Sequence, residues 1–463
     1  MLVSVRIWRC ALVDCFNPHQ ECYRLVLLNT WDGRVLADVT GAAPRLPQLS
    51  IARWSRPAKQ IQAEIERCWG FKAFILDIVE DPPGQPNIIL AELLVQPSYG
   101  WVPRQVEWAE PEVLLKRNNL SGDDRVLLAS ILDARDKSSP FSHIGWIHRA
   151  LVWFRRQVSL NDHEVYDVEQ WNAGSRALLL RLSEQRKTSY WLKAVDPGQS
   201  LEYRITLALA SLFPNRLPRV ISSNGMWGAW LMEHAGESAA DLLHMDAAAI
   251  GAMSRCFAEL QSASLTHIQA LFDCGCADWR LQRVRDSIFS ALPLLEEAMA
   301  AQDVHGLPQF GRRRIKNLCD MTEATCSLLD AIGIPDTLIH NDLQLDNIIA
   351  GAAGWQFIDW DQAGIGNPLL SFQLLRVQIP GTGEESLVSG YRSAWAEILR
   401  RETVDVALAL IPPIAVAVQL CRCVASIPPG TIPRSLELRH LRSLTRQLDA
   451  ALLPIRQLKR WSA

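Results

Sequence analysis

The most informative segment of the sequence reads Leu338-Ile339-His340-Asn341-Asp342-Leu343-Gln344-Leu345-Asp346-Asn347, and Asp359-Trp360-Asp361 follows it. Phosphoryl transfer needs one carboxylate at the attacking hydroxyl. It also needs an amide oxygen and a second carboxylate at the metal ions that neutralise the nucleotide's phosphates. Asp342, Asn347 and Asp359 supply these three groups in that order. The segment therefore predicts a phosphoryl-transfer site.

The residues between these groups predict how they are brought together. The segment Asn347–Ile358 is typical of a β-hairpin with its turn at Gly351–Gly354. If Ala350 pairs with Trp355, the first residue of the hairpin lies opposite the last, because cross-strand neighbours sit about 5 Å apart. The Asn347 amide and the Asp359 carboxylate then emerge at the same open end. Spacing alone thus predicts half of a metal site.

These residues also carry a resemblance to a known family. The pattern His-x-Asp-x-x-x-x-Asn, followed by Ile-Asp-Trp, is similar to the aminoglycoside phosphotransferase and choline kinase group, whose fold is a protein-kinase-like pair of lobes. The resemblance implies ATP and Mg²⁺ as cofactors, Asp342 as the catalytic residue, and Asn347 and Asp359 as metal ligands. It implies a structural role for His340, which would hydrogen-bond backbone near Asp359 rather than act as a base.

The resemblance extends upstream to a lysine and a glutamate. Kinase-like folds place a lysine on the third strand of the small lobe, where it contacts the phosphates and pairs with a glutamate on the next helix. Lys193 stands in the apolar strand-like segment 190–195, and Glu202 opens the helical stretch that follows. We therefore expect Lys193 and Glu202 to form this pair.

The remaining nucleotide contacts are predicted from position in the chain. The loop at 171–176 has fewer glycines than a protein kinase uses, so backbone donors are expected near Gly174 and Ser175. Backbone groups near Glu233 and Ala235, in the connection between the lobes, are expected to meet the adenine edge. Further on, Gly366-Asn367-Pro368 stands where this family often has Gly-Asp-Pro.

The expected fold class is α+β. We expect a two-lobed protein-kinase-like fold, with a small antiparallel β lobe and a larger helical lobe, preceded by a small α/β Nudix-like domain. A chain of 463 residues exceeds what one core usually supports. The predicted divisions are a degenerate Nudix-like domain at 1–135, a helical linker at 136–161 and a kinase domain at 162–463, with lobes at 162–232 and 237–463.

The N-terminal part is expected to alternate strands and a helix. Met1–Val13 is expected to be a first strand, and the linker helix is expected to dock the two domains together. The order of the later elements weakly resembles a Nudix-type domain, but Arg67 and Cys68 occupy the place of the metal-binding glutamate pair, so pyrophosphatase activity is not expected. The predicted elements are strands at 23–29, 34–38, 73–79 and 87–94 and a helix at 58–68.

Composition limits the partners. A net charge of −3 and a pI near 6.4 give no electrostatic reason to expect nucleic acid or an anionic membrane as partner. The basic cluster Arg312–Lys316 is either a solvated helix start or a contact to an anionic substrate. The longest apolar run, Val406–Leu420, contains Pro412-Pro413 and is shorter than the roughly 20 residues of a membrane span. It predicts a buried helix pair.

Eleven cysteines, without a Cys-x-x-Cys motif, suggest neither a disulfide framework nor structural zinc. Reduced thiols in the cytoplasm are the simplest expectation.

The predicted function is ATP- and Mg²⁺-dependent phosphoryl transfer to a hydroxyl of a small molecule. Aminoglycoside-like compounds, amino alcohols, sugars and natural-product intermediates all remain open as substrates. Six acidic residues either line a site for an aminated substrate or are ordinary surface charges: Asp246, Glu259, Asp273, Asp278, Glu296 and Glu297. The alternative function is a catalytically silent nucleotide-binding scaffold or sensor.

Overall fold

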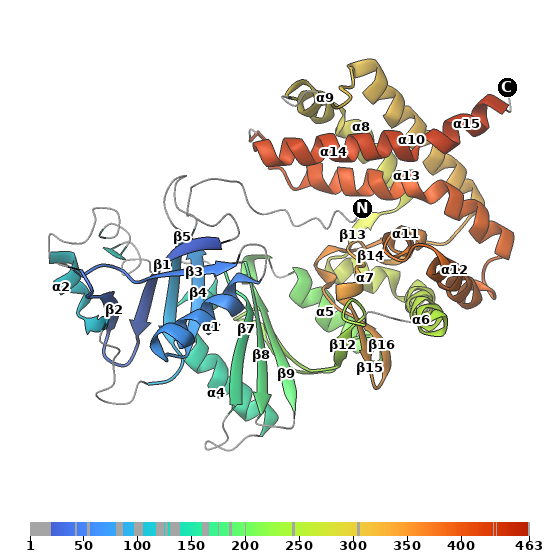
Figure 1. Ribbon diagram of the computed structural model, residues 1–463. Helices are drawn as coiled ribbons and strands as arrows, with labels where there is room; N and C mark the ends of the chain where they lie inside the picture. Colours follow the sequence, from blue (N-terminus) through green and yellow to red (C-terminus); the bar gives the residue numbers. More distant parts are fainter. Residues whose placement is uncertain are drawn as a thin grey trace. The chain divides into compact units, whose positions relative to one another are not determined.

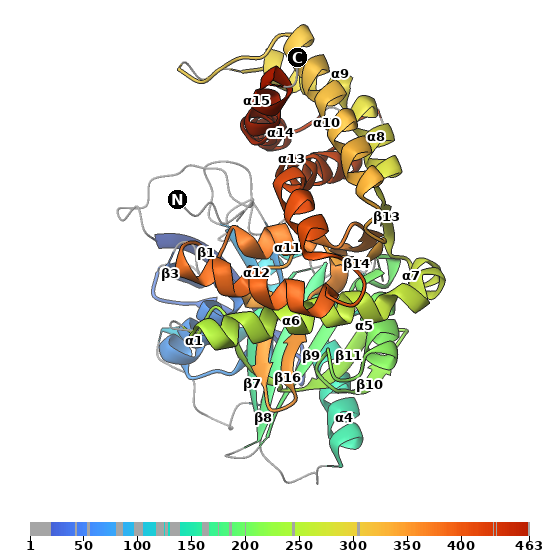
Figure 2. The ribbon, with the colours of Figure 1, turned by 90° about the vertical axis from the view of Figure 1, so that its right-hand side faces the viewer.

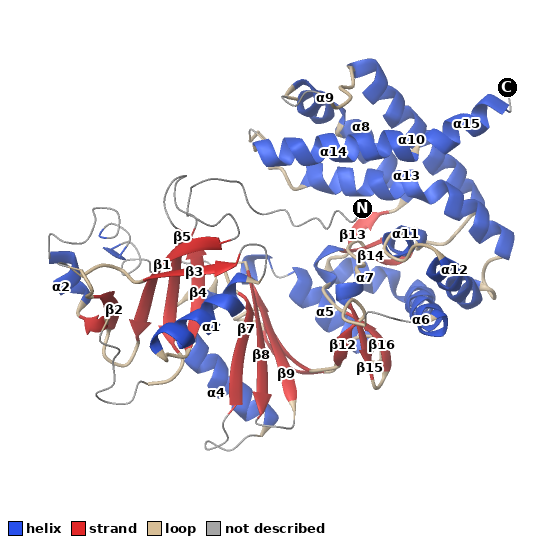
Figure 3. Ribbon diagram, viewed as in Figure 1, coloured by secondary structure: helices blue, strands red, loops and turns tan. Residues whose placement is uncertain are grey.

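The structure is a computed structural model that describes residues 20–461 apart from 42–43, 53–55, 80–86, 97–104, 117–124, 126–127, 130–138, 160–165, 175, 185–187, 200, 243–245, 303–305, 429 and 432. The predicted strand at Met1–Val13 and the predicted donor at Ser175 lie outside the described residues. Two compact units are present. Unit 1 contains Met1–Tyr203 and Arg219–His234, and unit 2 contains Arg204–Pro218 and Ala235–Ala463. Strands dominate unit 1 and helices dominate unit 2 (Figure 3).

The first sheet of unit 1 has six strands in the order β4-β5-β1-β2-β6, with β3 paired to β1. Strands β1 and β5 run parallel, and the other pairs are antiparallel. The strands predicted at 23–29, 34–38, 73–79 and 87–94 and the helix predicted at 58–68 are present, whereas β3 and β6 were not predicted. The elements are β1 (Gln20–Asn29), β2 (Arg34–Asp38), β3 (Gln48–Ala52), α1 (Pro57–Trp69), β4 (Ala73–Val79), β5 (Asn87–Leu93), β6 (Val106–Ala109) and α2 (Pro111–Lys116) (Figure 1).

Both faces of this sheet are covered, and the alternation along β1 shows how. Leu25 and Leu27 pack against the apolar face of α1, which presents Ile61 and Ile65 at helical spacing. Val26, between the two leucines, points to the opposite face and joins a different core.

That second core unites the first sheet with the next part of unit 1. It contains Phe74 from β4, Trp146 and Phe154 from α4 (Trp146–Val158), and Leu192 from the second sheet. The second sheet is antiparallel, with the order β10-β11-β9-β8-β7. The predicted linker helix therefore packs between two sheets in a shared core. The strands are β7 (Tyr166–Asn172), β8 (Ala177–Glu184), β9 (Ser189–Val195), β10 (Val220–Asn224) and β11 (Ala229–Glu233).

A buried glutamine also ties the sheets together. Gln170 is fully buried, and its side chain accepts from the Ile75 N–H and donates to the Ile75 carbonyl, each at 2.7 Å. Strand β4 is irregular between Ile75 and Asp77, and β7 is irregular between Gln170 and Asn172. The Gln170 amide thus continues the hydrogen bonding of edge strand β4 across two facing bulges.

A buried carboxyl in the same region predicts that the stability of unit 1 depends on pH. Glu92 on β5 is fully buried, and its Oε2 accepts from the Gly145 N–H at the start of α4 at 2.7 Å. Burial raises the pKa of Glu92 to about 7, against the hydrogen bonds from Gly145 and Ile147 and the charge of Arg149. The folded state therefore holds the proton more tightly than the unfolded state, and stability is lost as pH rises from the ordinary pKa of 4.5 towards 7.

We predict that Glu92→Gln removes this loss. The glutamine keeps the acceptor for Gly145 and cannot ionise, so the melting temperature of the variant minus that of the wild type should increase between pH 5 and pH 8. Differential scanning calorimetry at both pH values measures it. A difference that stays constant or shrinks with pH would contradict the assignment.

Unit 2 is mainly helical, as predicted. Helices α6 and α12 lie side by side (Figure 2), and their backbones meet closely where Gly390 faces Gly251. The helices are the end of α5 (Leu201–Leu212), α6 (Ala247–Ser264), α7 (Ile268–Cys274), α8 (Leu281–Ser290), α9 (Leu292–Ala300), α10 (Arg312–Ile332), α11 (Leu369–Arg376), α12 (Thr382–Trp395), α13 (Arg401–Ala425), α14 (Ser435–Ala451) and α15 (Leu453–Trp461).

Unit 2 also contains two small sheets, and His340, Asp342, Asn347 and Asp359 lie at or next to the ends of their strands. Their orders are β12-β15-β16 and β13-β17-β14. The strands are β12 (Gly236–Ser238), β13 (Ala277–Trp279), β14 (Thr337–His340), β15 (Ile348–Gly351), β16 (Gly354–Phe357) and β17 (Ala363–Gly366).

The prediction of a helix pair around the prolines is wrong. Helix α13 runs without a break through Pro412-Pro413. Proline lacks the N–H that would bond the carbonyl four residues earlier, and Arg376 Nη1 donates to the Leu408 carbonyl at 3.5 Å instead. By length and composition α13 is the one described helix that passes the test for a membrane span. However, 67% of its apolar window is buried inside the protein, as in a core helix.

Candidate active site

The hairpin formed by β15 and β16 has the predicted register. Ala350 pairs with Trp355, and Gly351 pairs with Gly354 at a tight turn. Gly354 has φ 98°, which disfavours other residues. At the open end the Ile358 N–H donates to the Asn347 carbonyl at 3.0 Å. The hairpin therefore brings Asn347 next to the residue that precedes Asp359.

His340, at the end of β14, holds two parts of the site together. Its Nε2 lies 2.8 Å from the Ile358 carbonyl, which confirms the predicted bond to backbone beside Asp359. Since a carbonyl only accepts, Nε2 carries the proton and Nδ1 accepts from the Asp342 N–H at 3.3 Å. Burial lowers the pKa of His340. Both nitrogens of the ring are therefore engaged with backbone groups, as the predicted structural role requires.

Asn347 is bonded to the loop that carries Asp342. Its Nδ2 donates to the Asp342 carbonyl at 2.9 Å, so the amide orientation is fixed and Oδ1 is turned away from that bond. The Asp342 carboxylate in turn accepts from Gln344 Nε2 at 2.8 Å. The amide oxygen and the carboxylate of Asp359, which follows the residue hydrogen-bonded to Asn347, are hard donors that suit Mg²⁺, which keeps waters and phosphate oxygens as its other ligands. The residues present therefore fit the implied metal.

Asp359 has an unusual backbone. Its φ of 67° lies in the left-handed region, one of two such non-glycine residues among those described. The fully buried Trp360 follows it, and Trp360 Nε1 donates to the Phe357 carbonyl at 2.9 Å. Its ring packs on His340, with centroids 4.4 Å apart. The strained residue is thus held by fixed neighbours on its C-terminal side, a pattern found at functional sites.

Three residues that support the loop were not predicted. Arg422 on α13 donates to the Asn341 carbonyl at 2.9 Å and also binds Gln362 Oε1. Gln378 Nε2 donates to the Leu343 carbonyl at 2.9 Å. Ser371 Oγ accepts from the His340 N–H at 2.7 Å. The sequence did contain a signal for Arg422, because this cation follows the long apolar run Val406–Leu420. A charge among buried residues needs hydrogen-bond partners.

Arg422 yields a testable prediction. Burial lowers its pKa, while Asp361 and Asp342 favour the charged form. Arg422→Met removes a charge-assisted hydrogen bond to the loop that carries Asp342, so ATP turnover should fall about tenfold. Steady-state kinetics measures it, with Arg401→Met, an exposed position on the same helix, as the control. Equal rates in both variants would show that Arg422 does not position the loop.

Asn367 lies just before α11, at the place where the family often has an aspartate. Its Oδ1 accepts from the Leu369 N–H at 3.0 Å, and the residue is buried. The amide therefore makes the local contact without a charge.

In unit 1, Lys193 and Glu202 form the predicted pair. Lys193 Nζ is in a salt bridge with Glu202 Oε1, and both side chains are largely buried. Gly174, in the turn between β7 and β8, has φ 132°, a conformation that favours glycine. The Glu233 N–H already donates to the Arg219 carbonyl at 3.0 Å. If Glu233 contacts the adenine of a nucleotide, it therefore does so through a group other than this N–H.

Five of the six acidic candidates have local partners instead of gathering at one site. Asp246 caps α6 and Asp273 binds Gln269. The other three pair with arginines: Glu259 with Arg216 at 2.7 Å, Asp278 with Arg280 at 2.7 Å and Glu296 with Arg312 at 3.3 Å. These contacts are those of ordinary surface charges.

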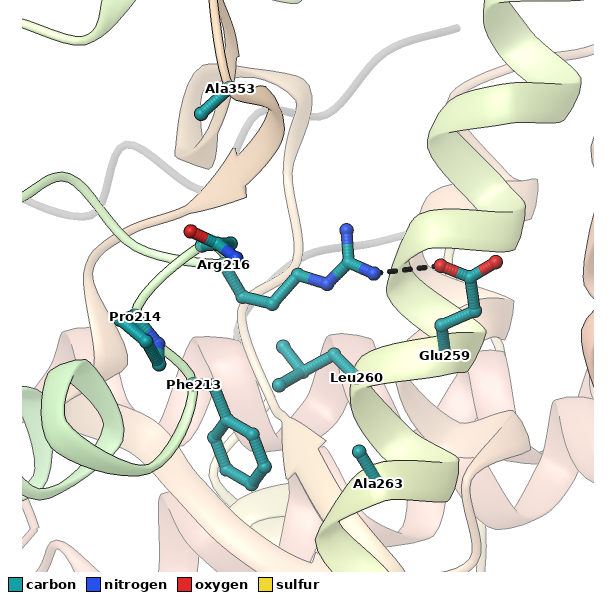
Figure 4. Close-up of a pocket in the computed structure, with 8 residues that line it drawn as sticks. Phe213, Pro214, Arg216, Glu259, Leu260, Ala263 and Ala353 are labelled. Atoms are coloured by element: carbon teal, nitrogen blue, oxygen red, sulfur yellow. Dashed lines mark hydrogen bonds and ion pairs between the residues drawn. The ribbon is translucent and has the colours of Figure 1, made fainter.

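A hollow of about 540 Å³ in unit 2 is lined by the Arg216–Glu259 pair, Phe213 and Ala353 (Figure 4). Ala353 belongs to the turn of the hairpin. Each strand has four residues, so the turn lies about 13 Å from the open end. The hollow is therefore separate from the end where Asn347 lies.

The basic cluster lines a second hollow of about 790 Å³ at the start of α10. Most of its charge is balanced, since Arg312 pairs with Glu296, Arg314 with Asp449 and Lys316 with Asp320.

Comparison with solved structures returns kinases and phosphotransferases at low identity. A choline/ethanolamine kinase family protein from Mesorhizobium loti is 13% identical, covers 65% of this chain and 95% of its own, and has a TM-score of 0.42. An ethanolamine kinase from Plasmodium vivax is 15% identical, with coverages of 73% and 96% and a TM-score of 0.43. A macrolide 2'-phosphotransferase from Brachybacterium faecium is 13% identical, with coverages of 64% and 97% and a TM-score of 0.44. No curated protein sequence matches the chain.

A family model described as the phosphotransferase enzyme family matches residues 155–403, more than half of the chain. The match contains Lys193, Glu202, Asp342, Asn347 and Asp359. It begins after the first sheet, so the Nudix-like character of that sheet stays a prediction. The chain therefore belongs to the phosphotransferase enzyme family, and its strands and helices form the expected α+β fold.

Proposed function

We propose that the protein transfers the γ-phosphoryl group of ATP, bound with Mg²⁺, to a hydroxyl of a small molecule. The observation that carries the proposal is the hydrogen-bonded network of the loop and hairpin. His340 bonds the Ile358 carbonyl, and Asn347 bonds the Asp342 carbonyl. This network holds the backbone at Asp342 and Ile358 and the amide of Asn347, which supports the assignment of the catalytic base to Asp342 and of the metal ligands to Asn347 and Asp359. Preorganised groups of this kind lower the barrier to phosphoryl transfer.

Each residue then has a defined task. The Asp342 carboxylate holds the acceptor hydroxyl in line with the γ-phosphorus and takes its proton as the new P–O bond forms and the bond to ADP breaks. Asn347 Oδ1 and the Asp359 carboxylate hold Mg²⁺, which supplies neutralisation of the phosphate charge. Lys193, oriented by Glu202, contacts the α and β phosphates.

Backbone groups contact the adenine and the remaining oxygens of the triphosphate. Backbone donors at Gly174 and Ser175 contact the phosphates, and backbone groups at Glu233 and Ala235 contact the adenine. The cysteines that the structure describes are all free thiols, which supports our placement of the enzyme in the reducing cytoplasm.

The test is ³¹P NMR of ATP and Mg²⁺ with the full chain and a panel of aminoglycosides, amino alcohols and sugars, with GTP in parallel. We expect ADP and a phosphate ester on at least one class of acceptor. ATP that binds but stays intact with every acceptor, and is not hydrolysed slowly either, would favour the silent scaffold.

A further inference from the structure

Trp171 links the N-terminal helix α1 to the second sheet. It occupies the bulge of β7, next to the buried Gln170. Two cations at the start of α1 lie over its ring: Arg56 Cζ is 4.2 Å and Lys59 Nζ is 4.9 Å from the ring centroid. Such contacts are favourable and fix the plane of the indole.

A carboxylate closes this arrangement. Lys59 Nζ pairs with Glu169 Oε1 at 2.6 Å, and Glu169 Oε2 accepts from Trp171 Nε1 at 2.8 Å. The lysine, the glutamate and the tryptophan thus each contact the other two. The indole is held at its face by α1 and at its edge by its own strand.

Trp171 also contacts β9, the strand that carries Lys193. The rings of Trp171 and Trp191 meet edge to face, with centroids 5.0 Å apart. Trp191 Nε1 donates to His234 Nδ1 at 3.1 Å. Trp191 and Lys193 are two residues apart on β9, so their side chains leave the same face of the sheet. The contacts that begin at α1 and pass through Trp171 and Trp191 therefore reach the face of β9 that carries Lys193, the lysine we propose to bind the phosphates.

We propose that Arg56 and Lys59 are positioning residues for the nucleotide: by holding Trp171 they set the turn at Gly174 and the face of β9 that carries Lys193. The inference rests on the proposed function, and it gives the N-terminal sheet and helix a part in binding the phosphoryl donor. Neither cation needs to touch the nucleotide. Their loss weakens binding because the bulge of β7 and the Trp171–Trp191 contact lose their fixed geometry.

The experiment uses the full-length protein and removes two different sets of contacts between the N-terminal part of unit 1 and β7. The double variant Arg56→Ala/Lys59→Met removes both cations from Trp171. The control, Lys72→Met, removes another exposed pair between the N-terminal sheet and β7, in which Lys72 Nζ lies 3.1 Å from Asp167 Oδ1. A conservative variant, Arg56→Lys/Lys59→Arg, keeps both charges. Isothermal titration with ATP and Mg²⁺ gives the dissociation constant, and calorimetry gives the melting temperature.

We expect the double variant to raise the dissociation constant about fivefold, with the control and the conservative variant within about twofold of the wild type. A purely structural role would lower the melting temperatures of the double variant and the control without separating their affinities. Unchanged affinity in the double variant, or an equal loss in the control, would overturn the inference alone. A wild type that does not bind ATP would overturn the proposed function as well.

Discussion

Replacing Asp342 by asparagine should lower phosphoryl transfer at least about a hundredfold and leave the affinity for ATP and Mg²⁺ within about twofold. The asparagine has the same size and still accepts from Gln344, whose Nε2 lies 2.8 Å from Asp342 Oδ1. The backbone carbonyl that binds Asn347 is untouched. Only the capacity to take the proton of the acceptor hydroxyl is lost, so the defect should appear in kcat.

A matched control lies in the same loop. Asp346 is exposed, and Asp346→Asn makes the same chemical change four residues away. Its rate of ATP turnover should remain close to that of the wild type. If Asp342→Asn retains full turnover, or if both variants lose it equally, Asp342 is not the catalytic carboxylate.

Replacing Asp359 by asparagine should remove the dependence of ATP binding on Mg²⁺. The carboxylate is the only charged group that we assign to the metal. Its neutralisation therefore weakens the binding of Mg²⁺ and, through Mg²⁺, the binding of the triphosphate. We expect turnover to fall by about a hundredfold or more. Asparagine is the informative substitution because it tolerates left-handed backbone, and Asp359 has φ 67°.

The measurement is a titration of ATP at several Mg²⁺ concentrations, with EDTA as the metal-free reference. The wild type should bind more tightly as Mg²⁺ rises, whereas Asp359→Asn should show a nearly flat dependence. The Mg²⁺ dependence of Asn347→Ala should lie between those of the wild type and Asp359→Asn, since the amide contributes a ligand without charge. A steep Mg²⁺ dependence retained in Asp359→Asn would place the metal elsewhere.

The hairpin was predictable because its signals are local. Gly351 and Gly354 mark a turn, and once Ala350 is opposite Trp355 the whole register follows. The same holds for β2 and β4, whose predicted bounds match those in the structure. The pairing of Lys193 with Glu202 came from the resemblance, and the structure shows the salt bridge.

The supports of the loop were not predictable, because they come from distant parts of the chain. Arg422 bonds the carbonyl of Asn341 from α13, and Gln378 bonds the carbonyl of Leu343 from beyond α11. No pattern in the sequence specifies which side chain meets which backbone group across such separations.

Tertiary packing also overrode local signals. Pro412-Pro413 indicates a helix end, yet burial on both sides and the donation from Arg376 to Leu408 maintain α13 as one helix. In unit 1, the bond of Gln170 to Ile75 depends on two bulges that side-chain alternation cannot reveal.

The most direct test of the account is isothermal titration of the full-length wild type, Asp342→Asn and Asp359→Asn with ATP, each with Mg²⁺ and with EDTA. The account predicts Mg²⁺-dependent binding in the wild type and in Asp342→Asn, and loss of that dependence in Asp359→Asn. Absence of ATP binding in the wild type, or binding that is indifferent to both Mg²⁺ and Asp359, would contradict it.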